Sequence, residues 1–210
     1  MYIPRQFALS DDETEAALAQ AAFAHLITHD SSGYLVTPLP MIYDGRSLIG
    51  HVSRANRHWK ADGSESVAIF SGPHAYISPS FYATKAETGK VVPTWNYEIL
   101  NVYGTLVSHD DPDWVLNLVT RLTNRHEQHR AEPWQVTDAP ESYTRAQLRA
   151  IVGVELVISK VEGKSKMSQN QPERNREGVV AGLRRSGAAD DQLVADRVAA
   201  LGSTNANGRG

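Results

Sequence analysis

The chain has 210 residues, no cysteine, and a formal net charge of −3 from 21 Lys and Arg against 24 Asp and Glu. Without cysteine the sequence excludes a disulfide framework, a zinc ribbon, an iron–sulfur cluster and a thiol nucleophile. The slight acidity argues against a domain built wholly for nucleic-acid binding, because such domains are usually basic. No apolar run reaches the ~18 residues of a membrane span, and residues 1–15 lack the basic start and apolar core of a signal peptide. We therefore predict a cytoplasmic protein with no membrane segment.

The N-terminal part of the sequence predicts one helix followed by hairpin-connected strands. Ser10 and Glu13 match a capping box at the start of that helix. Pro38 and Pro40 lie inside the second strand, and because proline cannot donate to a ladder, this strand is expected to be an edge, bulged or irregular. The expected elements are a helix over 10–22, strands over 23–29, 34–43 and 47–53, and a helical turn over 54–60.

The remaining sequence predicts further strands and mostly C-terminal helices. Gly72-Pro73 is expected to break a strand, and the polar residues 84–92 are expected to form an exposed loop. Asp111 with Pro112 marks the start of a helix, and Thr144 with Gln147 matches a second capping box. The expected elements are strands over 67–71, 74–78, 94–108 and 151–161, and helices over 112–126, from about 144, over 172–183 and over 188–201.

The order of these elements predicts the fold class. About six or seven short strands come first, with three or more helices inserted and appended, and the strands are joined by hairpins rather than by βαβ crossovers. The prediction is therefore a mainly β protein with added helices, built on an antiparallel barrel or sandwich.

Histidine and acidic residues do not predict a metal site. His126 and His129 fit a solvated helix end, where cations face the negative end of the dipole. His25 and His29 lie four residues apart in a predicted strand, roughly 13 Å, which is too far to share one ion.

One short segment concentrates groups that suit a phosphate. Residues 51–60, HVSRANRHWK, bring a hydroxyl, an amide and several cations to a point where a strand runs into a helical turn. A phosphate is bound by such donors and by free N–H groups at a helix start. A solvated surface turn explains the same residues equally well.

Two other segments allow both a binding and a structural interpretation. Residues 160–186 carry seven basic and three acidic side chains, and they include the polar run 164–171, KSKMSQNQ. This run suits a clamp for a polar ligand, although a solvated linker is the favoured interpretation. Residues 72–82 and 92–97 alternate aromatic with small polar residues, which suits a pocket wall for a ring system, or core packing, which is favoured for most of them.

Taken together, these segments resemble the PaiB-type proteins, a family of FMN-binding negative transcriptional regulators in the split-barrel superfamily of pyridoxine-phosphate oxidase. The matching motifs are Met1-Tyr2-x-Pro4-x-x-Phe7, the stretch 51–59, Gly72-Pro-x-Ala-Tyr-Ile-Ser-Pro-Ser80, Val92-Pro-Thr-Trp-Asn-Tyr97, Lys164-x-Lys-x-Ser-Gln-Asn170 and Gly178-Val-x-x-Gly-Leu183. The sequence departs from the family pattern at Arg57, Phe81, Asn101 and Gln171, where proline, tryptophan, histidine and a basic residue are usual.

The resemblance implies an antiparallel split β-barrel with a C-terminal helical extension, forming a homodimer with FMN at its interface. It divides the chain into a barrel domain over 1–163, a polar segment and helices over 164–201, and a flexible tail over 202–210. It places Ser53, Arg54 and Asn56 at the flavin phosphate, with Lys60 or Arg57 nearby. The implied cofactor-binding set also contains Thr37, Pro38, Leu39, His51, Trp95, Asn96, Ser168, Gln169 and Asn170, the last three from the partner subunit.

The resemblance also implies a function. The first hypothesis is a flavin-binding regulatory protein, a transcriptional regulator in the family description. The alternatives are a flavin-dependent oxidoreductase acting on a small substrate and a split barrel that binds haem. Because the chain is net acidic and shows no helix-turn-helix signature, direct DNA binding is expected to be weak or absent.

Overall fold

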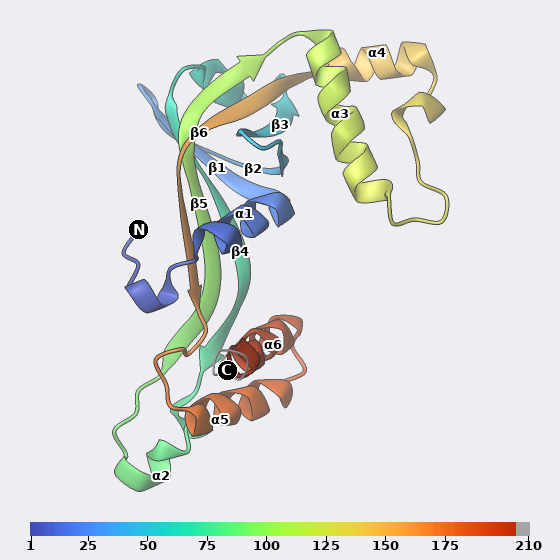
Figure 1. Ribbon diagram of the computed structural model, residues 1–210. Coiled ribbons are helices and arrows are strands. Elements are labelled where there is room, and N and C mark those ends of the chain that lie inside the picture. The colour runs from blue at the N-terminus through green and yellow to red at the C-terminus, as the bar shows by residue number, and fades with distance from the viewer. Residues whose placement is uncertain (205–210) are drawn as a thin grey trace. The chain divides into compact units, whose positions relative to one another are not determined.

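Six strands form an antiparallel barrel in the computed structural model, which describes residues 1–204 (Figure 1). Their order around the barrel is β1-β2-β3-β6-β5-β4. The predicted class, a mainly β split barrel with added helices, is confirmed. The strands are β1 (Phe23–Asp30), β2 (Gly33–Tyr43), β3 (Ser47–Ser53), β4 (Glu65–Ile77), β5 (Thr94–His109) and β6 (Ile151–Lys166).

The helices lie before, between and after the strands. The α-helices are α1 (Asp11–Gln20), α2 (Thr84–Thr88), α3 (Pro112–Glu127), α4 (Glu141–Arg149), α5 (Glu173–Arg184) and α6 (Ala189–Thr204). The short 3-10 turns are η1 (Arg5–Phe7), η2 (Arg57–Ala61), η3 (Pro79–Phe81) and η4 (Val136–Asp138). Among the described helices, none has the length and apolar character needed to cross a membrane.

The chain divides into two compact units. The barrel unit contains Glu13–Phe70 and Asn101–Val161, and the helical unit contains Met1–Asp12, Ser71–Leu100 and the described residues from Glu162 onward. Inside the barrel unit, fully buried side chains from successive strands form the core, among them Leu26, Met41 and Leu156. On the outside of the barrel, Leu118 and Leu122 of α3 pack against two isoleucines of β2 and β3.

The two prolines of β2 sit where they remove no hydrogen bond to β1. The N–H of Met41 donates to the carbonyl of Ala22, so β1 lies on that side of the strand. Because backbone groups alternate along a strand, the nitrogens of Pro38 and Pro40 point to the opposite edge. Pairing of β2 with β3 on that edge begins only at Met41. β2 therefore pairs regularly with β1, but it is not paired with β3 over Pro38 and Pro40. The irregularity predicted for this strand is confined to its edge toward β3.

The helical unit is held together by a second core. Met167, Val179 and Leu183 pack with Val198 of α6, and α5 and α6 run side by side (Figure 1). Two glycines of α5 allow η3 to pack directly against the helix. A Cβ on Gly178 would lie 2.0 Å from the carbonyl oxygen of Phe81, and one on Gly182 would lie 2.4 Å from the Phe81 ring.

Several predicted boundaries were wrong. β4 continues through Gly72-Pro73, and since its pairing with β1 ends at Ile69, the proline removes no bond to β1. The helix expected from about Thr144 begins at Glu141, after Pro140 as N-cap. The structure thereby places Thr144 inside the helix, where its hydroxyl donates to the carbonyl of Pro140.

Tertiary contacts explain two further differences. Within the expected loop 84–92, residues 84–88 form α2, which ends at Gly89 with φ 64° and is anchored by Asn175 from α5. β6 runs five residues past its predicted end, because Leu9 donates to the carbonyl of Gly163 and Ala8 bridges to Lys164. Of the expected tail 202–210, residues 202–204 belong to α6 and residues 205–210 lie outside the described residues.

Candidate functional site

The residues implied to bind the cofactor fall in both units, and each unit is described by itself. The barrel unit holds Thr37, Pro38, Leu39, His51, Ser53, Arg54, Asn56 and Lys60. The helical unit holds Trp95, Asn96, Ser168, Gln169 and Asn170.

The segment after β3 forms a tight turn that leads into η2. The N–H of Asn56 donates to the carbonyl of Ser53 at 2.8 Å, and the N–H of Ala55 donates to the Ser53 hydroxyl oxygen at 3.3 Å. The side-chain oxygen of Asn56 then caps η2 by accepting from the N–H of His58 at 2.9 Å. The expected helical turn is thus present as a 3-10 turn over 57–61. Ser53 remains exposed at its start.

Arg54 is engaged inside the chain. Its guanidinium makes a bidentate pair with the carboxylate of Asp110, and its Nε donates to the carbonyl of Arg149 at 2.7 Å. The hydrogen bond to Asp110 raises the pKa of Arg54 and, reciprocally, lowers the pKa of Asp110. Of the predicted phosphate ligands, Arg54 therefore has most of its donors already used, whereas Arg57 and Lys60 are exposed cations of the same segment.

A buried polar network lies beneath this segment, and the sequence did not indicate it. His58 is wholly buried, and its ring nitrogens pair with the hydroxyls of Thr37 at 2.9 Å and Thr28 at 2.8 Å. The amide nitrogen of Asn56 donates to the Thr37 hydroxyl at 3.1 Å, and Thr28 continues the chain to the hydroxyl of Ser66 at 2.6 Å. Burial lowers the pKa of His58. Thr37 and Asn56 thus hold the turn in place from inside the barrel.

Of the three cofactor-binding residues predicted on β2, only Pro38 is exposed on the outside of the barrel. Leu39 is 3% exposed and belongs to the core. Pro38 is exposed on the outer face of the barrel, next to His25, its partner in register on β1. The outward groups of this stretch are therefore the Pro38 ring and the strand edge that β3 leaves open.

Three buried polar atoms have no hydrogen-bond partner within residues 1–204: Ser47 Oγ, His51 Nδ1 and Asn101 Oδ1. His51 pairs in register with Gly153, whose missing side chain leaves room for the Trp114 ring of α3. Burial lowers the pKa of His51. Leaving a buried polar atom without a hydrogen-bond partner costs about 1–3 kcal/mol of stability. A hydrogen bond from a ligand or a water to any of these three atoms would therefore be favourable and would displace no existing bond.

In the helical unit, the residues after β6 form a turn locked by Asn96. Ser168 has φ 63° and is 3% exposed, and its hydroxyl pairs with the fully buried Asn96 amide at 3.0 Å. The Gln169 side chain accepts from the N–H of Met167 at 2.6 Å and donates to the carbonyl of Ser165 at 2.7 Å. Asn170 is exposed. The polar run is therefore a built turn rather than the solvated linker that the sequence favoured.

Trp95 points away from this turn. Neighbouring residues of a strand face opposite sides, and Trp95 is 51% exposed while Asn96 is fully buried. Its ring contacts those of His74 and Tyr76 at centroid distances of 6.0 and 6.1 Å. These aromatics are therefore outside the core, whereas Ile77 and Tyr82 of the same stretch are inside it.

The residues present fit FMN in their chemistry. The exposed Ser53 hydroxyl with the cations Arg57 and Lys60 suits a phosphate dianion. Within the barrel unit, the edge of β2 that β3 leaves open over Pro38 and Pro40 suits the polar edge of a flavin ring. When bound, FMN supplies hydride and electron transfer, for which the protein provides binding and electrostatics.

The antiparallel split barrel is the fold of a class of flavin-binding proteins. The FAD and heme binding protein from Mycobacterium smegmatis has this fold, with a TM-score of 0.60 at 16% identity over 85% of this chain and 80% of that one. The family described as "Putative FMN-binding domain" matches residues 1–160. The chain therefore belongs to the FMN-binding split-barrel family of PaiB type, and FMN is its cofactor.

Relatives by sequence are found in bacteria and fungi. The protease synthase and sporulation protein PAI 2 of Bacillus subtilis is 28% identical over 190 residues, 87% of this chain and 89% of that protein. An uncharacterized protein of Emericella nidulans is 36% identical over 145 residues, 64% of this chain. The match spans only 58% of the length of that fungal protein.

Proposed function

We propose that this FMN-binding protein is a regulatory protein, in which the flavin acts as a ligand or redox signal and changes how the protein interacts with other molecules. The observation that carries this proposal is the state of His58. This histidine lies inside the predicted phosphate segment, and its ring nitrogens are bonded to the hydroxyls of the half-buried Thr37 and the buried Thr28. The exposed groups of the segment, Ser53, Arg57 and Lys60, are hydrogen-bond donors suited to holding an anion.

An exposed apolar face on the barrel suits contact with a second copy of the chain, as expected for a dimer that binds the flavin at its interface. The outer face of β1 and β2 carries exposed apolar side chains, with Phe23 at 59%, Tyr34 at 77% and Val36 at 57%. In register, Phe23 pairs with Pro40, and Val36 with Ile27, which makes one continuous face. Exposed apolar patches of this kind typically mark protein interfaces. We propose that this face forms a homodimer.

Sedimentation velocity tests the dimer. Val36→Glu places a charge within the proposed face and is expected to yield a monomer. Tyr143→Glu on α4, where the tyrosine is 58% exposed, is the matched control and is expected to leave the dimer intact. A wild-type monomer, or a dimer that survives Val36→Glu, would contradict this interface.

Reductant and DNA assays separate a regulator from an enzyme. Anaerobic mixing of the FMN-loaded protein with NADH or NADPH is expected to leave the flavin absorbance unchanged over seconds. Bleaching within that time would favour the oxidoreductase alternative. Direct DNA binding is expected to be weak or absent, and a sequence-specific gel shift that weakens steeply with added salt would overturn that expectation.

A further inference from the structure

A cavity of about 220 Å³ lies within the helical unit, between α2, β5 and the turn after β6. This is smaller than the roughly 300–1,000 Å³ of pockets for drug-sized ligands. Two lysines and several hydroxyl and amide side chains line it, and no Asp or Glu is among its described lining residues. The polar lining residues used below are Lys90, Thr94, Lys166, Ser168, Asn170 and Gln171.

Lys166 is partly buried without a negative partner. Its Nζ donates to the hydroxyl of Thr94 and to the carbonyl of Trp95 at 2.9 Å, and both acceptors are neutral. One ammonium donor is left over, since an ammonium has three. Burial lowers the pKa of Lys166, partly offset by the nearby Tyr97. A buried positive charge held only by neutral acceptors is stabilised when an anion approaches it.

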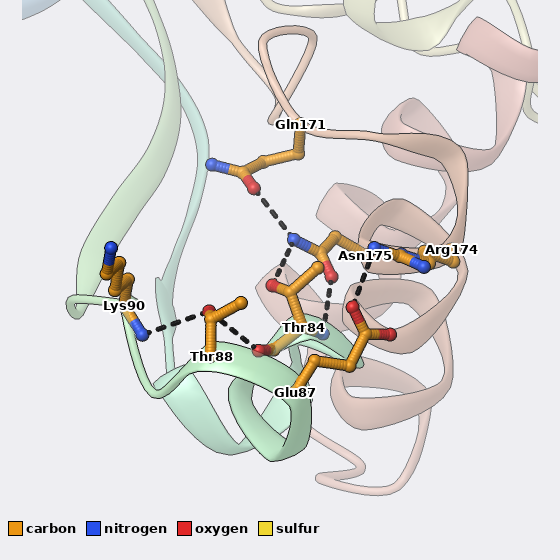
Figure 2. A network of polar contacts seen from close by, with 7 residues as sticks. All are labelled: Thr84, Glu87, Thr88, Lys90, Gln171, Arg174 and Asn175. Carbon is orange, nitrogen blue, oxygen red and sulfur yellow. Dashed lines mark hydrogen bonds and ion pairs between the residues drawn. The ribbon is translucent and has the colours of Figure 1, made fainter.

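The amide of Gln171 is oriented toward the same cavity by a network of fixed contacts (Figure 2). Its oxygen accepts from the Asn175 amide at 2.9 Å, and Asn175 is 2% exposed and also donates to the Thr84 hydroxyl at 3.0 Å. The Gln171 nitrogen is therefore turned away from Asn175 and is free to donate. Asn170 and Lys90, both exposed, add further donors.

We propose that this cavity binds a small oxyanion, either a phosphate or a short carboxylate, as a second ligand beside the flavin. The ammonium groups of Lys166 and Lys90 provide the charge, and the amides of Gln171 and Asn170 provide oriented donors. Charged hydrogen bonds of this kind are the strong ones in proteins. The cavity size limits the ligand to a few heavy atoms or to the anionic end of a larger molecule.

Calorimetric titration of the FMN-loaded full chain tests the site, with inorganic phosphate and malonate as probes at constant ionic strength. We expect saturable one-to-one binding of at least one probe. Lys90→Met is expected to weaken it about tenfold, and it keeps the backbone N–H bond from residue 90 to Thr88. Lys85→Met is the matched control, since Lys85 on α2 donates to Ser80 and does not line the cavity.

The outcomes distinguish the sources of the anion and the role of FMN. Binding of phosphate alone assigns a phosphate-type ligand, and binding of malonate alone assigns a carboxylate. The proposal is overturned if neither probe saturates up to about 50 mM, or if Lys85→Met weakens binding as much as Lys90→Met. It is also overturned if phosphate competes with FMN for the flavin-free protein, because the cavity would then hold the flavin phosphate and FMN binding itself would stand.

Discussion

Because Gly178 lies directly against η3, we expect Gly178→Ala to destabilise the protein, although helix propensity alone favours alanine. In an exposed helix interior, Gly→Ala stabilises by about 0.5–1 kcal/mol. In α5, however, the new Cβ would lie 2.0 Å from the Phe81 carbonyl oxygen, about 1.4 Å short of the 3.4 Å at which ordinary contact begins. The obstacle is a backbone atom, so no rotamer change relieves it. Overpacking of this kind costs about 1–3 kcal/mol.

We therefore expect Gly178→Ala to lower the free energy of unfolding by about 1–2 kcal/mol after the propensity gain is subtracted. For a chain of this size the melting temperature should fall by about 2–8 °C. Urea denaturation followed by circular dichroism measures the change. Ala181→Gly, at an exposed position of the same helix, is the control and should cost about 0.5–1 kcal/mol. A Gly178→Ala variant more stable than wild type would show that the Cβ is accommodated without a clash against Phe81.

Two further predictions concern the barrel unit. Burial lowers the pKa of His58 in the folded protein, while the unfolded histidine titrates near its ordinary value of about 6.5. The unfolded state then binds more protons below that pH, so the stability from neutral His58 is complete above about pH 6.5 and is lost as pH falls toward the folded pKa. Urea denaturation at pH 7.5 and 5.5 measures the free energy of unfolding. Its decrease between the two pH values should be smaller for His58→Gln than for wild type, and equal decreases would contradict a lowered pKa of His58. Asp111→Ala removes the N-cap bond to the N–H of Trp114, so its free energy of unfolding should fall by about 1 kcal/mol, whereas an unchanged urea midpoint would contradict that role.

Local signals in the sequence predicted much of the barrel. Asp44-Gly45 indicated the turn between β2 and β3, and Asp111 with Pro112 predicted the first residue of α3 correctly. These signals depend only on neighbours in the chain, as turns and caps do. The class of fold followed from hairpin connections between the strands.

The elements that sequence could not predict depend on distant residues. α2 is anchored by Asn175, which lies 91 residues away from Thr84 in the chain. The C-terminal extension of β6 depends on pairing with Ala8 and Leu9. Composition around 84–92 and 162–166 carries no trace of these partners, so a loop and a linker were the natural expectations.

The candidate site shows the same division. Sequence identified the phosphate-like segment 51–60, but it could not show that Asp110 engages Arg54 or that Thr37 and Asn56 support a buried histidine. It also could not separate Trp95 from Asn96, because the alternation of a strand becomes meaningful only once its buried face is known. Of the residues predicted at or near the phosphate, the structure leaves Ser53, Arg57 and Lys60 exposed, whereas Arg54 and Asn56 are half-buried.

We propose that the segment after β3 holds the phosphate of FMN. The most direct measurement is a paired titration of FMN and riboflavin, followed by flavin absorbance between about 350 and 500 nm. The matched variants are Ser53→Ala with Lys60→Ala, which removes two exposed groups of the segment, and Arg121→Ala, an exposed arginine of α3, as control. We expect the double change to weaken FMN binding about tenfold or more and hardly to alter riboflavin binding, while the control changes neither. Unchanged FMN affinity in the double variant, or no flavin binding by the wild-type protein, would contradict it.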